Sequence, residues 1–272
     1  MKEIPMSEVK QIGLQTLCYF DAFCRQHDLK YYLAYGSLLG AIRHQGYIPW
    51  DDDIDVWMFR EDYQRLIALN QEIDQTQYLL NCIECNESFV VPFAKLTRTD
   101  TVIYPTRYVT GYLYGLSIDI FPLDVIGDYT DEKEARQCLL SVRNKHLAVL
   151  NKYHHTTGGK EEKWFKKLAK KAVYFYASKK YGSLSERIKD YAQALMTSFP
   201  EASGQYVTTI DGTTVFRKDW FDRIIEVQFE DHHLFAPAFY DEILRQRYGD
   251  YMAFPPKEQQ VIPHTYKAYY LD

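Results

Sequence analysis

The sequence lacks any run of about 18 consecutive apolar residues, which is the length that an α-helix needs to cross a bilayer. Its first ten residues also lack an apolar core of signal-peptide length. We therefore predict a cytoplasmic protein with neither a transmembrane helix nor a secretion signal.

Cysteine is scarce, and its number is odd. The chain has five cysteines, Cys18, Cys24, Cys82, Cys85 and Cys138. An odd count without a signal peptide favours reduced thiols. Cys82 and Cys85 form a single C-x-x-C pair, but no second Cys or His pair lies near them in the sequence, which argues against zinc. We predict five reduced thiols that serve as small core or surface residues.

The chain also lacks an excess of positive charge. Its 32 Lys and Arg residues are outnumbered by 37 Asp and Glu residues, which gives a formal net charge of −5. Domains that bind nucleic acid through its phosphates are usually basic. The charge balance therefore argues against a nucleic-acid partner, while a hydrophobic content of 46% is ample for a folded core.

An acidic run between apolar residues, Asp51-Asp52-Asp53-Ile54-Asp55, is the most informative segment. Carboxylates this close together raise one another's pKa unless a cation lies among them. Side chains two apart share one face of a strand, so Asp53 and Asp55 are predicted to point outward together, with Ile54 toward the core. Asp52 is then predicted to point to the opposite face, into solvent.

A third carboxylate lies in a second predicted strand, residues 116–121. Asp119 alternates there with two isoleucines, which puts it on the polar face of a buried strand. A carboxylate in such a place needs a partner or a metal ion. Two Asp side chains from one strand and one from its neighbour suit Mg²⁺ or Mn²⁺. We predict a metal site formed by Asp53, Asp55 and Asp119.

Upstream of the acidic run, an apolar strand is followed by Gly36-Ser37 and by a helix that ends at about Arg43. A Gly-Ser turn at a helix N-terminus offers N–H groups and a hydroxyl to a phosphate. Arg43 and His44 are candidates for the same phosphate, or for a contact with the dipole at the C-terminus of the helix. Lys95 and Arg98 are candidates for neutralising further phosphates.

Three explanations other than a catalytic metal site apply to a run of carboxylates. A solvated loop is the usual place of a charge run, but apolar residues flank this one on both sides. A calcium loop of the EF-hand type requires Gly where Val56 stands and Glu where Asp62 stands. The third alternative is a structural ion pair with Arg43 or Arg60.

The pattern of apolar residues indicates an α+β protein with a small mixed sheet, flanking helices and an appended, mainly helical region. A helix is expected from Ser7, as its N-cap, to about His27. The other expected elements are a helix at 60–70, β-strands within 88–104, helices within 131–196, short strands within 206–229 around the Asp211-Gly212 turn, and a helix at 241–248 that Gly249 ends.

Residues 35–55 are similar to the core motif of the LicD family, and their order of Gly-Ser and Asp-x-Asp before a later Asp resembles the nucleotidyltransferase superfamily. Residues 117–124 and 247–252, the latter followed by Pro255-Pro256, are also similar to LicD proteins. LicD proteins are bacterial phosphocholine transferases, and relatives transfer other phosphorylated alcohols. One departure is Lys267, where a second His is expected.

The resemblance implies a nucleotidyltransferase-like core in residues 1–125, completed by helices, strands and tail in residues 126–272. It implies Mg²⁺-dependent transfer of phosphocholine from CDP-choline to a hydroxyl of a glycan precursor of the teichoic acid or lipopolysaccharide type, with release of CMP. Asp51, Asp119 or Asp124 could assist the metal or accept the proton. Transfer of ribitol phosphate or glycerol phosphate, nucleotidyl transfer and plain calcium binding remain alternatives.

Two further expectations concern ligands and membranes. Aromatic faces recognise quaternary ammonium groups such as choline, and Tyr47, Trp50 and Trp57 flank the acidic run. The segment from Lys160 to Lys180 reads as a basic amphipathic helix. This helix either contacts the inner face of the plasma membrane, near a lipid-linked glycan acceptor, or packs its apolar face on the protein.

Overall fold

The computed structural model describes residues 1–86, 89, 91–105, 113–127, 129, 131–151, 179, 186, 189–191, 193–194, 204–209, 214–262 and 266–271. The predicted basic helix at 160–180 lies outside these residues except for Lys179, so its contact with a membrane stays a prediction. Among the described residues, no helix combines the length and the apolar character that crossing a bilayer requires.

A seven-stranded mixed sheet forms the centre of the described chain. Its strand order is β1-β2-β6-β4-β3, and β7 joins β6 while β8 joins β7. β2 and β6 run parallel, and the other pairs are antiparallel. The predicted α+β class is confirmed. The strands are β1 (Tyr32–Leu33), β2 (Asp55–Phe59), β3 (Tyr78–Asn81), β4 (Ala94–Arg98), β6 (Ser117–Ile126), β7 (Tyr206–Thr209) and β8 (Val215–Arg217).

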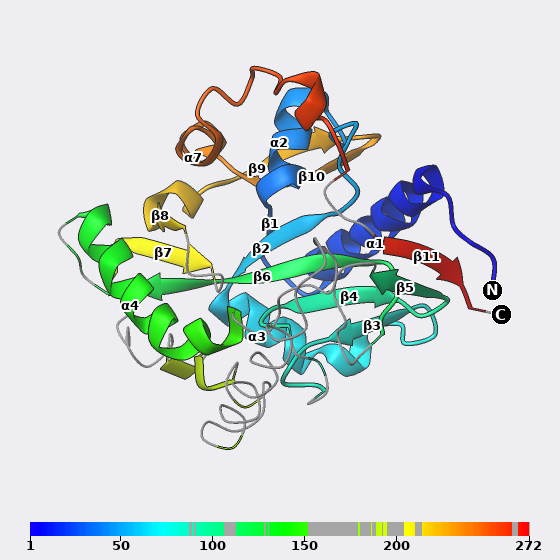
Figure 1. Cartoon of the computed structure of the whole chain (residues 1–272), viewed down its shortest axis with the longest axis horizontal. Helices are drawn as coiled ribbons and strands as arrows, with labels where there is room; N and C mark the ends of the chain where they lie inside the picture. Colours follow the sequence, from blue (N-terminus) through cyan, green and yellow to red (C-terminus); the bar gives the residue numbers. More distant parts are fainter. Residues whose placement is uncertain are drawn as a thin grey trace, which may run out of the picture.

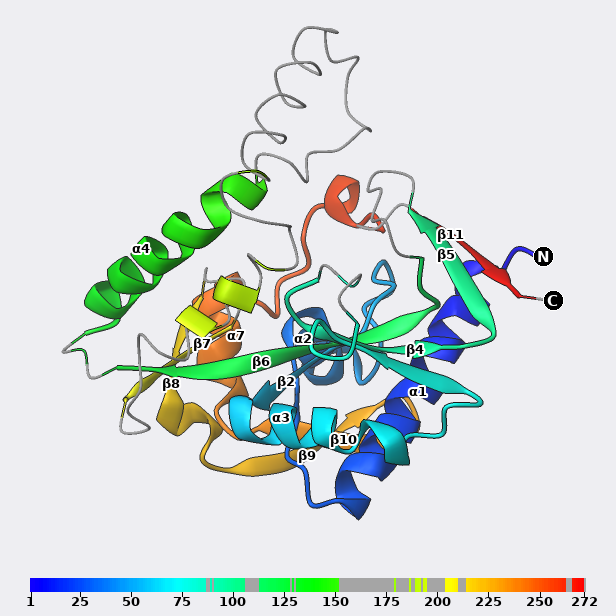
Figure 2. The ribbon, with the colours of Figure 1, turned by 90° about the horizontal axis from the view of Figure 1, so that it is seen from below.

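Strand β6 organises this sheet because it is long enough to have two successive neighbours on one edge. Its first half pairs with β4 and its second half with β7, while β2 runs along the other edge. Figure 2 shows β6 crossing the molecule, with β4 near one end and β7 near the other. Ile118 and Ile120 are completely buried, so Asp119 lies on the opposite face of the strand.

Helices lie on both sides of the sheet. In Figure 2, where β6 runs across the view, α4 lies on one side of β6 and α3 on the other; Figure 1 shows α2, α7 and the β9–β10 hairpin above β6. The helices are α1 (Met6–Gln26), α2 (Tyr35–His44), α3 (Arg60–Ala68), α4 (Glu132–Asn151) and α7 (Tyr240–Tyr248), with short 3₁₀ helices at Asn70–Glu72, Lys218–Phe221 and Lys257–Gln259. The remaining strands are β5 (Thr101–Pro105), β9 (Ile224–Phe229), β10 (His232–Pro237) and β11 (Tyr266–Tyr270).

Several predicted elements are confirmed, with shifted ends. Helix α1 is present, but its N-cap is Pro5 and the expected N-cap, Ser7, lies inside the helix. Helix α7 ends at Gly249, whose φ of 68° is a backbone conformation that glycine adopts readily. Strands β7 and β8 pair antiparallel as expected for a hairpin, although the Asp211-Gly212 turn lies outside the described residues.

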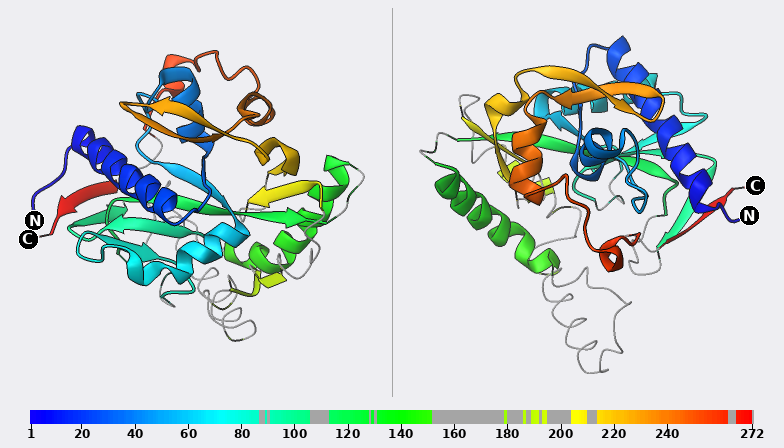
Figure 3. Two further views of the ribbon diagram at one scale, coloured as in Figure 1. Left: turned by 180° about the vertical axis from the view of Figure 1, so that it is seen from behind. Right: turned by 90° about the horizontal axis from the view of Figure 1, so that it is seen from above.

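The N-terminal helix is bonded to the C-terminal strand at the edge of the molecule. The Tyr270 hydroxyl donates to Glu8 at 2.7 Å, and the N–H of Ile4 donates to the carbonyl of Ala268 at 2.8 Å. Both views of Figure 3 show the two chain ends side by side. Strand β11 also pairs with β5, so it joins the N-terminal segment to the strand β5.

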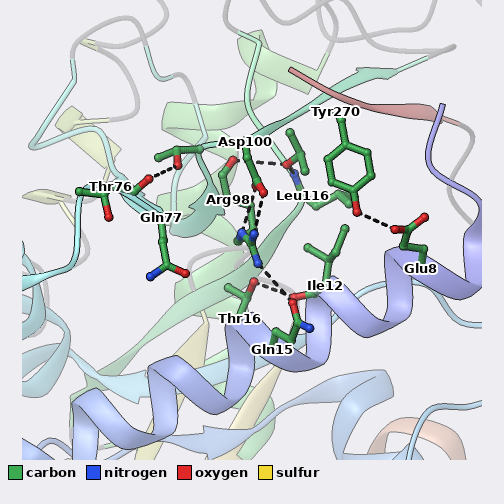
Figure 4. Close-up of polar contacts among 12 residues, drawn as sticks. Glu8, Ile12, Gln15, Thr16, Thr76, Gln77, Arg98, Asp100, Leu116 and Tyr270 are labelled. Carbon is green, nitrogen blue, oxygen red and sulfur yellow. Dashed lines mark hydrogen bonds and ion pairs between the residues drawn. The ribbon is translucent and has the colours of Figure 1, made fainter. Parts of the chain in front are cut away.

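Arg98 belongs to this edge of the fold. Its guanidinium donates to both carboxylate oxygens of Asp100, at 3.1 and 2.7 Å, and to Gln15 of α1 at 3.3 Å (Figure 4). These partners hold the turn between β4 and β5 against α1. The structure therefore gives Arg98 neutralising partners other than the phosphates proposed from the sequence.

Cys82 and Cys85 form a disulfide, which contradicts the prediction of five reduced thiols. The N–H of Cys85 donates to the carbonyl of Cys82 in a tight turn, and the turn brings the two Cα atoms to 5.2 Å, within the range of a disulfide. The prediction rested on cell compartment and cysteine count, neither of which describes this local geometry. The free cysteines are Cys18, Cys24 and Cys138.

Candidate active site

Three neighbouring strands bring an acidic pair and a lysine side by side. Asp55 of β2 lies in register with Asp119 of β6, and Asp119 lies in register with Lys95 of β4. The N–H of Asp119 also donates to the carbonyl of Ile54 at 2.8 Å, which extends the pairing by one residue. Two of the three carboxylates predicted to bind metal are therefore direct neighbours across the parallel strand pair.

Asp53 does not share a strand with Asp55, because β2 begins only at Asp55. The predicted alternation is nevertheless present in the burial of the side chains, because Asp53 and Asp55 are half-buried and Ile54 between them is buried. Asp51, Asp52 and Asp53 form a group in the preceding loop, with one carboxylate oxygen of each within 4.8 Å of the others. Both groups meet at Asp55, since the charges of Asp53 and Asp51 act on its carboxyl.

Asp52 is only 6% exposed, so the prediction that it is solvated is wrong. The Asp52 carboxylate forms a hydrogen bond with the phenol of Tyr266, and burial together with this carboxylate raises the pKa of that phenol. Tyr266 is the first residue of β11. The C-terminal strand thus brings a side chain to the acidic loop, which local alternation could not reveal.

The neighbouring carboxylates repel the charged form of Asp55. Burial raises the pKa of its carboxyl well above the ordinary value, and the charges of Asp53 and Asp119 raise it further. The nearby charge of Lys95 acts in the opposite direction. Carboxylate oxygens are the ligands that Mg²⁺ and Mn²⁺ prefer, and a divalent cation would offset this repulsion. The residues present therefore fit the predicted metal.

Lys95 is the buried positive charge of the site, with 8% of its surface exposed. Its ammonium group donates to Oδ1 of Asp119 and lies 5.2 Å from the ring centroids of both Phe93 and Tyr114. Burial is the largest single influence and lowers the pKa of Lys95, but the charge of Asp119, the Tyr114 phenol, the hydrogen bond to Asp119 and the charge of Asp55 together raise it above the ordinary value. Lys95 therefore lies among the predicted site residues, bonded to a carboxylate.

The first turn of α2 is attached directly to strand β2. The N–H of Asp55 donates to Oγ of Ser37 at 2.9 Å, and the N–H of Ala34 donates to the carbonyl of Asp55 at 2.9 Å. N–H groups in the first turn of a helix have no acceptor within the helix. The N-terminal end of α2, the end of a helix at which anions bind in other proteins, is thereby positioned beside the carboxylates.

Gly36 permits the close approach of the acidic loop to α2. A Cβ atom at this position would collide with Oδ2 of Asp51. The absence of a side chain therefore has a steric purpose in addition to the phosphate contact predicted from the sequence. Gly36, Ser37 and Asp51 are brought together with Asp55 in one place.

Tyr35 is a site residue that the sequence reasoning missed. It begins α2 with a φ of 43°, a left-handed conformation that costs a non-glycine residue about 1 kcal/mol or more. Edge-to-face packing of its ring on Trp57 and Phe121, with ring centroids 5.0 and 5.3 Å away, offsets this strain. A bulky aromatic residue directly before Gly36 is the signal that could have identified it.

Arg43 and His44 lie at the other end of α2, about 10 Å along the helix axis from Gly36-Ser37. Arg43 donates to the backbone carbonyls of Tyr251 at 2.7 Å and Ala253 at 3.2 Å, and its Nε donates to His44. These bonds attach the segment after α7 to the end of α2. The structure does not bring this pair to the start of the helix, where a phosphate would bind.

The aromatic residues proposed for choline have other contacts in the structure. Trp57 is completely buried, and the Tyr47 hydroxyl donates to the carbonyl of Lys10 at 2.9 Å. Trp50 packs near Phe254, with ring centroids 6.2 Å apart. Phe93 and Tyr114 are further aromatic residues near the carboxylates, because both rings contact Lys95, which bonds Asp119.

Asp124 lies on the opposite face of β6 from Asp119, because the two residues are an odd number of positions apart. Its carboxylate accepts two bonds from Arg60, at 2.7 and 2.6 Å. The side chains of Asp124 and Arg60 are only 4% and 16% exposed. Asp124 therefore joins β6 to the start of α3 in the structure, away from the other carboxylates.

Replacement of Asp124 by Asn is expected to lower the free energy of unfolding by about 3 kcal/mol, because it leaves the buried charge of Arg60 without a counter-charge. Urea denaturation measures this loss. Asp219→Asn is the matched control, since Asp219 pairs with Arg217 on the surface and its loss should cost less than about 1 kcal/mol. Equal losses in the two variants would contradict a buried pair.

Comparison with known proteins identifies relatives along the whole chain. A family described as LicD/FKTN/FKRP, nucleotidyltransferase domain, matches residues 28–137. The lipopolysaccharide cholinephosphotransferase LicD of Haemophilus influenzae is 30% identical over 279 residues, which cover 100% of both chains. An uncharacterised protein of Rickettsia prowazekii is 39% identical over 156 residues, 48% of this chain and 59% of that protein.

A carboxylate-bearing parallel strand pair beside a helix N-terminus, in a chain similar from end to end to a cholinephosphotransferase, defines an enzyme of the transferase class. The relationship can be stated more closely, because the identity extends over complete chains. The protein belongs to the LicD family.

Proposed function

We propose that this enzyme transfers phosphocholine from CDP-choline to a hydroxyl group of a lipid-linked cell-surface glycan precursor and releases CMP. The observation that carries the proposal is the full-length similarity to a lipopolysaccharide cholinephosphotransferase. The arrangement of Asp55 and Asp119 beside the first turn of α2 supports it. We also propose a nucleotidyltransferase-like fold for the core, on the description of the matching family.

The reaction is an in-line displacement at phosphorus. The bond between the phosphocholine phosphorus and the oxygen of CMP breaks, and a bond to the acceptor oxygen forms. The acceptor loses its proton to a base, for which Asp51 and Asp119 are the candidates. Asp53, Asp55 and Asp119 would hold Mg²⁺ or Mn²⁺, which when bound supplies positive charge to the phosphoryl group and to the leaving CMP.

The protein's own groups have positioning roles in this scheme. The first turn of α2, with Gly36 and the Ser37 hydroxyl, would orient a donor phosphate. Ser37 accepts from the N–H of Asp55, so its own hydroxyl hydrogen is left to be donated to a phosphate oxygen. Lys95 holds Asp119 through an ion pair and would keep that carboxylate in place beside Asp55.

A panel of activated alcohols tests this function. With Mg²⁺ and a lipopolysaccharide-type or teichoic-acid-type acceptor present, CMP release from CDP-choline is expected to exceed release from CDP-ribitol or CDP-glycerol at least tenfold. Omission of the acceptor should remove most of the release. Preferred use of CDP-ribitol would reassign the transferred alcohol, and absence of CMP from every donor would overturn the proposal.

A further inference from the structure

Arg247 lies over the aromatic ring that begins α2. It is in the last turn of α7, which packs beside α2 (Figure 3). Its guanidinium carbon is 4.3 Å from the ring centroid of Tyr35 and 5.7 Å from that of Tyr248. Tyr35 directly precedes Gly36-Ser37, so the positive charge stands next to the proposed phosphate-binding turn.

The hydrogen-bonding partners of Arg247 are uncharged hydroxyl groups, those of Tyr248 and Thr214. Its Nη1 donates to the hydroxyl of Thr214 at 3.1 Å, and Arg247 forms no ion pair with a carboxylate of the described residues. In the described part of the chain, six other arginines do pair with Asp or Glu, namely Arg25, Arg60, Arg65, Arg98, Arg217 and Arg245. Arg247 therefore carries a charge that no carboxylate of the described residues pairs with, in a position that packing on Tyr35 defines.

Tyr248 connects this charge with the carboxylates. Burial raises the pKa of the Tyr248 phenol, the charge of Arg247 lowers it, and the charges of Asp55 and Asp51 raise it. The charge of Arg247 and the charges of Asp55 and Asp51 therefore all act on the Tyr248 phenol. A ligand bound beside Tyr248 would therefore be subject to the charge of Arg247 and to that of the carboxylates.

We propose that Arg247, held over Tyr35, binds the diphosphate of the CDP-activated donor. The inference rests on the proposed function, which requires a donor with two linked phosphates. A guanidinium presents two parallel N–H donors that match phosphate oxygens. The stacking on Tyr35 orders the side chain before the donor arrives, which reduces the entropy lost on binding.

Arg247→Gln tests the inference, with the matched control Arg245→Gln two residues earlier on the same helix. Arg245 is 62% exposed and pairs with Asp241. Arg247→Gln is expected to raise the KM for CDP-choline and the inhibition constant of CDP about tenfold or more, with a smaller fall in kcat. Arg245→Gln should leave both constants within twofold. Arg247→Lys keeps the positive charge but loses the two parallel N–H donors. Its KM for CDP-choline and its inhibition constant for CDP should lie between those of Arg247→Gln and wild type.

Calorimetry with Mn²⁺ and no nucleotide separates phosphate binding from a structural role. Arg247→Gln should bind Mn²⁺ as wild type does, because Arg247 touches no carboxylate of the described residues. Unchanged constants for CDP, or a parallel loss of Mn²⁺ and CDP affinity, would overturn the inference. If wild type bound CDP but released no CMP from CDP-choline, only the proposed choline specificity would fail, since CDP binding still reports on Arg247.

Discussion

Replacement of Asp55 by Asn is expected to lower phosphocholine transfer by roughly a hundredfold to a thousandfold, the range seen when a group that stabilises transition-state charge is removed. Asn keeps the size of the side chain and its place in β2 but loses the charge that would hold a metal ion. Initial rates of CMP release at saturating Mg²⁺, together with Mn²⁺ binding by calorimetry, measure the two losses.

The same variant should be at least as stable as the wild-type protein when no metal is present. Burial and the charges of Asp53 and Asp119 disfavour the ionised form of Asp55, and Asn removes that repulsion. Lys95 keeps its partner, because it bonds Asp119. Thermal unfolding in the presence of a chelator measures this effect.

Asp100→Asn is the matched control for Asp55→Asn. Asp100 pairs with Arg98 at the partly exposed turn between β4 and β5, so its loss should leave transfer within twofold. Near wild-type transfer by Asp55→Asn would exclude Asp55 as a metal ligand. A metal-free Asp55→Asn protein much less stable than wild type would instead indicate a structural role for this carboxylate.

Gly36→Ala is expected to lower transfer about a hundredfold, because the new Cβ atom displaces Asp51 or the first turn of α2 from its place. A shift of about 1 Å in a catalytic group can have an effect of this size. The added methyl collides with the Asp51 carboxylate, whereas alanine itself suits a helix. Initial rates of CMP release measure the loss, and far-ultraviolet circular dichroism should show an intact fold.

A double-mutant cycle identifies the cause of that loss. In the Asp51→Ala background the colliding carboxylate is absent, so Gly36→Ala should produce little further loss of transfer. The two changes should therefore be strongly non-additive, as expected for residues in direct contact. Additive losses would show that Gly36 acts through its own backbone, for example by binding phosphate, and not through Asp51.

Local patterns determined much of this protein. Alternation in residues 117–120 correctly assigned Ile118 to the core and Asp119 to the other face, because side chains of a strand point alternately to its two sides. The apolar pattern also predicted helices α1, α3 and α7 within a few residues of their observed ends. These features depend on residues close together in the chain.

The alternation in burial continues through residues 51–55, but the prediction that Asp52 faces solvent was wrong, because Asp52 is buried. Asp51, Asp52 and Asp53 lie in a loop before β2, so their directions follow from bonds to other segments. Asp52 turns inward to Tyr266 of β11, a strand that forms by pairing with β5. The spacing of residues within the acidic run gives no information about Tyr266, which is distant in the sequence.

Only the tertiary structure determined which groups the basic residues contact. Sequence reasoning grouped Arg43 with the phosphate turn because it is near in the chain, yet its bonds go to carbonyls after α7. Arg247 lies over Tyr35 from 212 positions away. Periodicity specifies which face of an element is apolar, but only the packing of whole elements decides which charges meet, since the burial of apolar faces drives that packing.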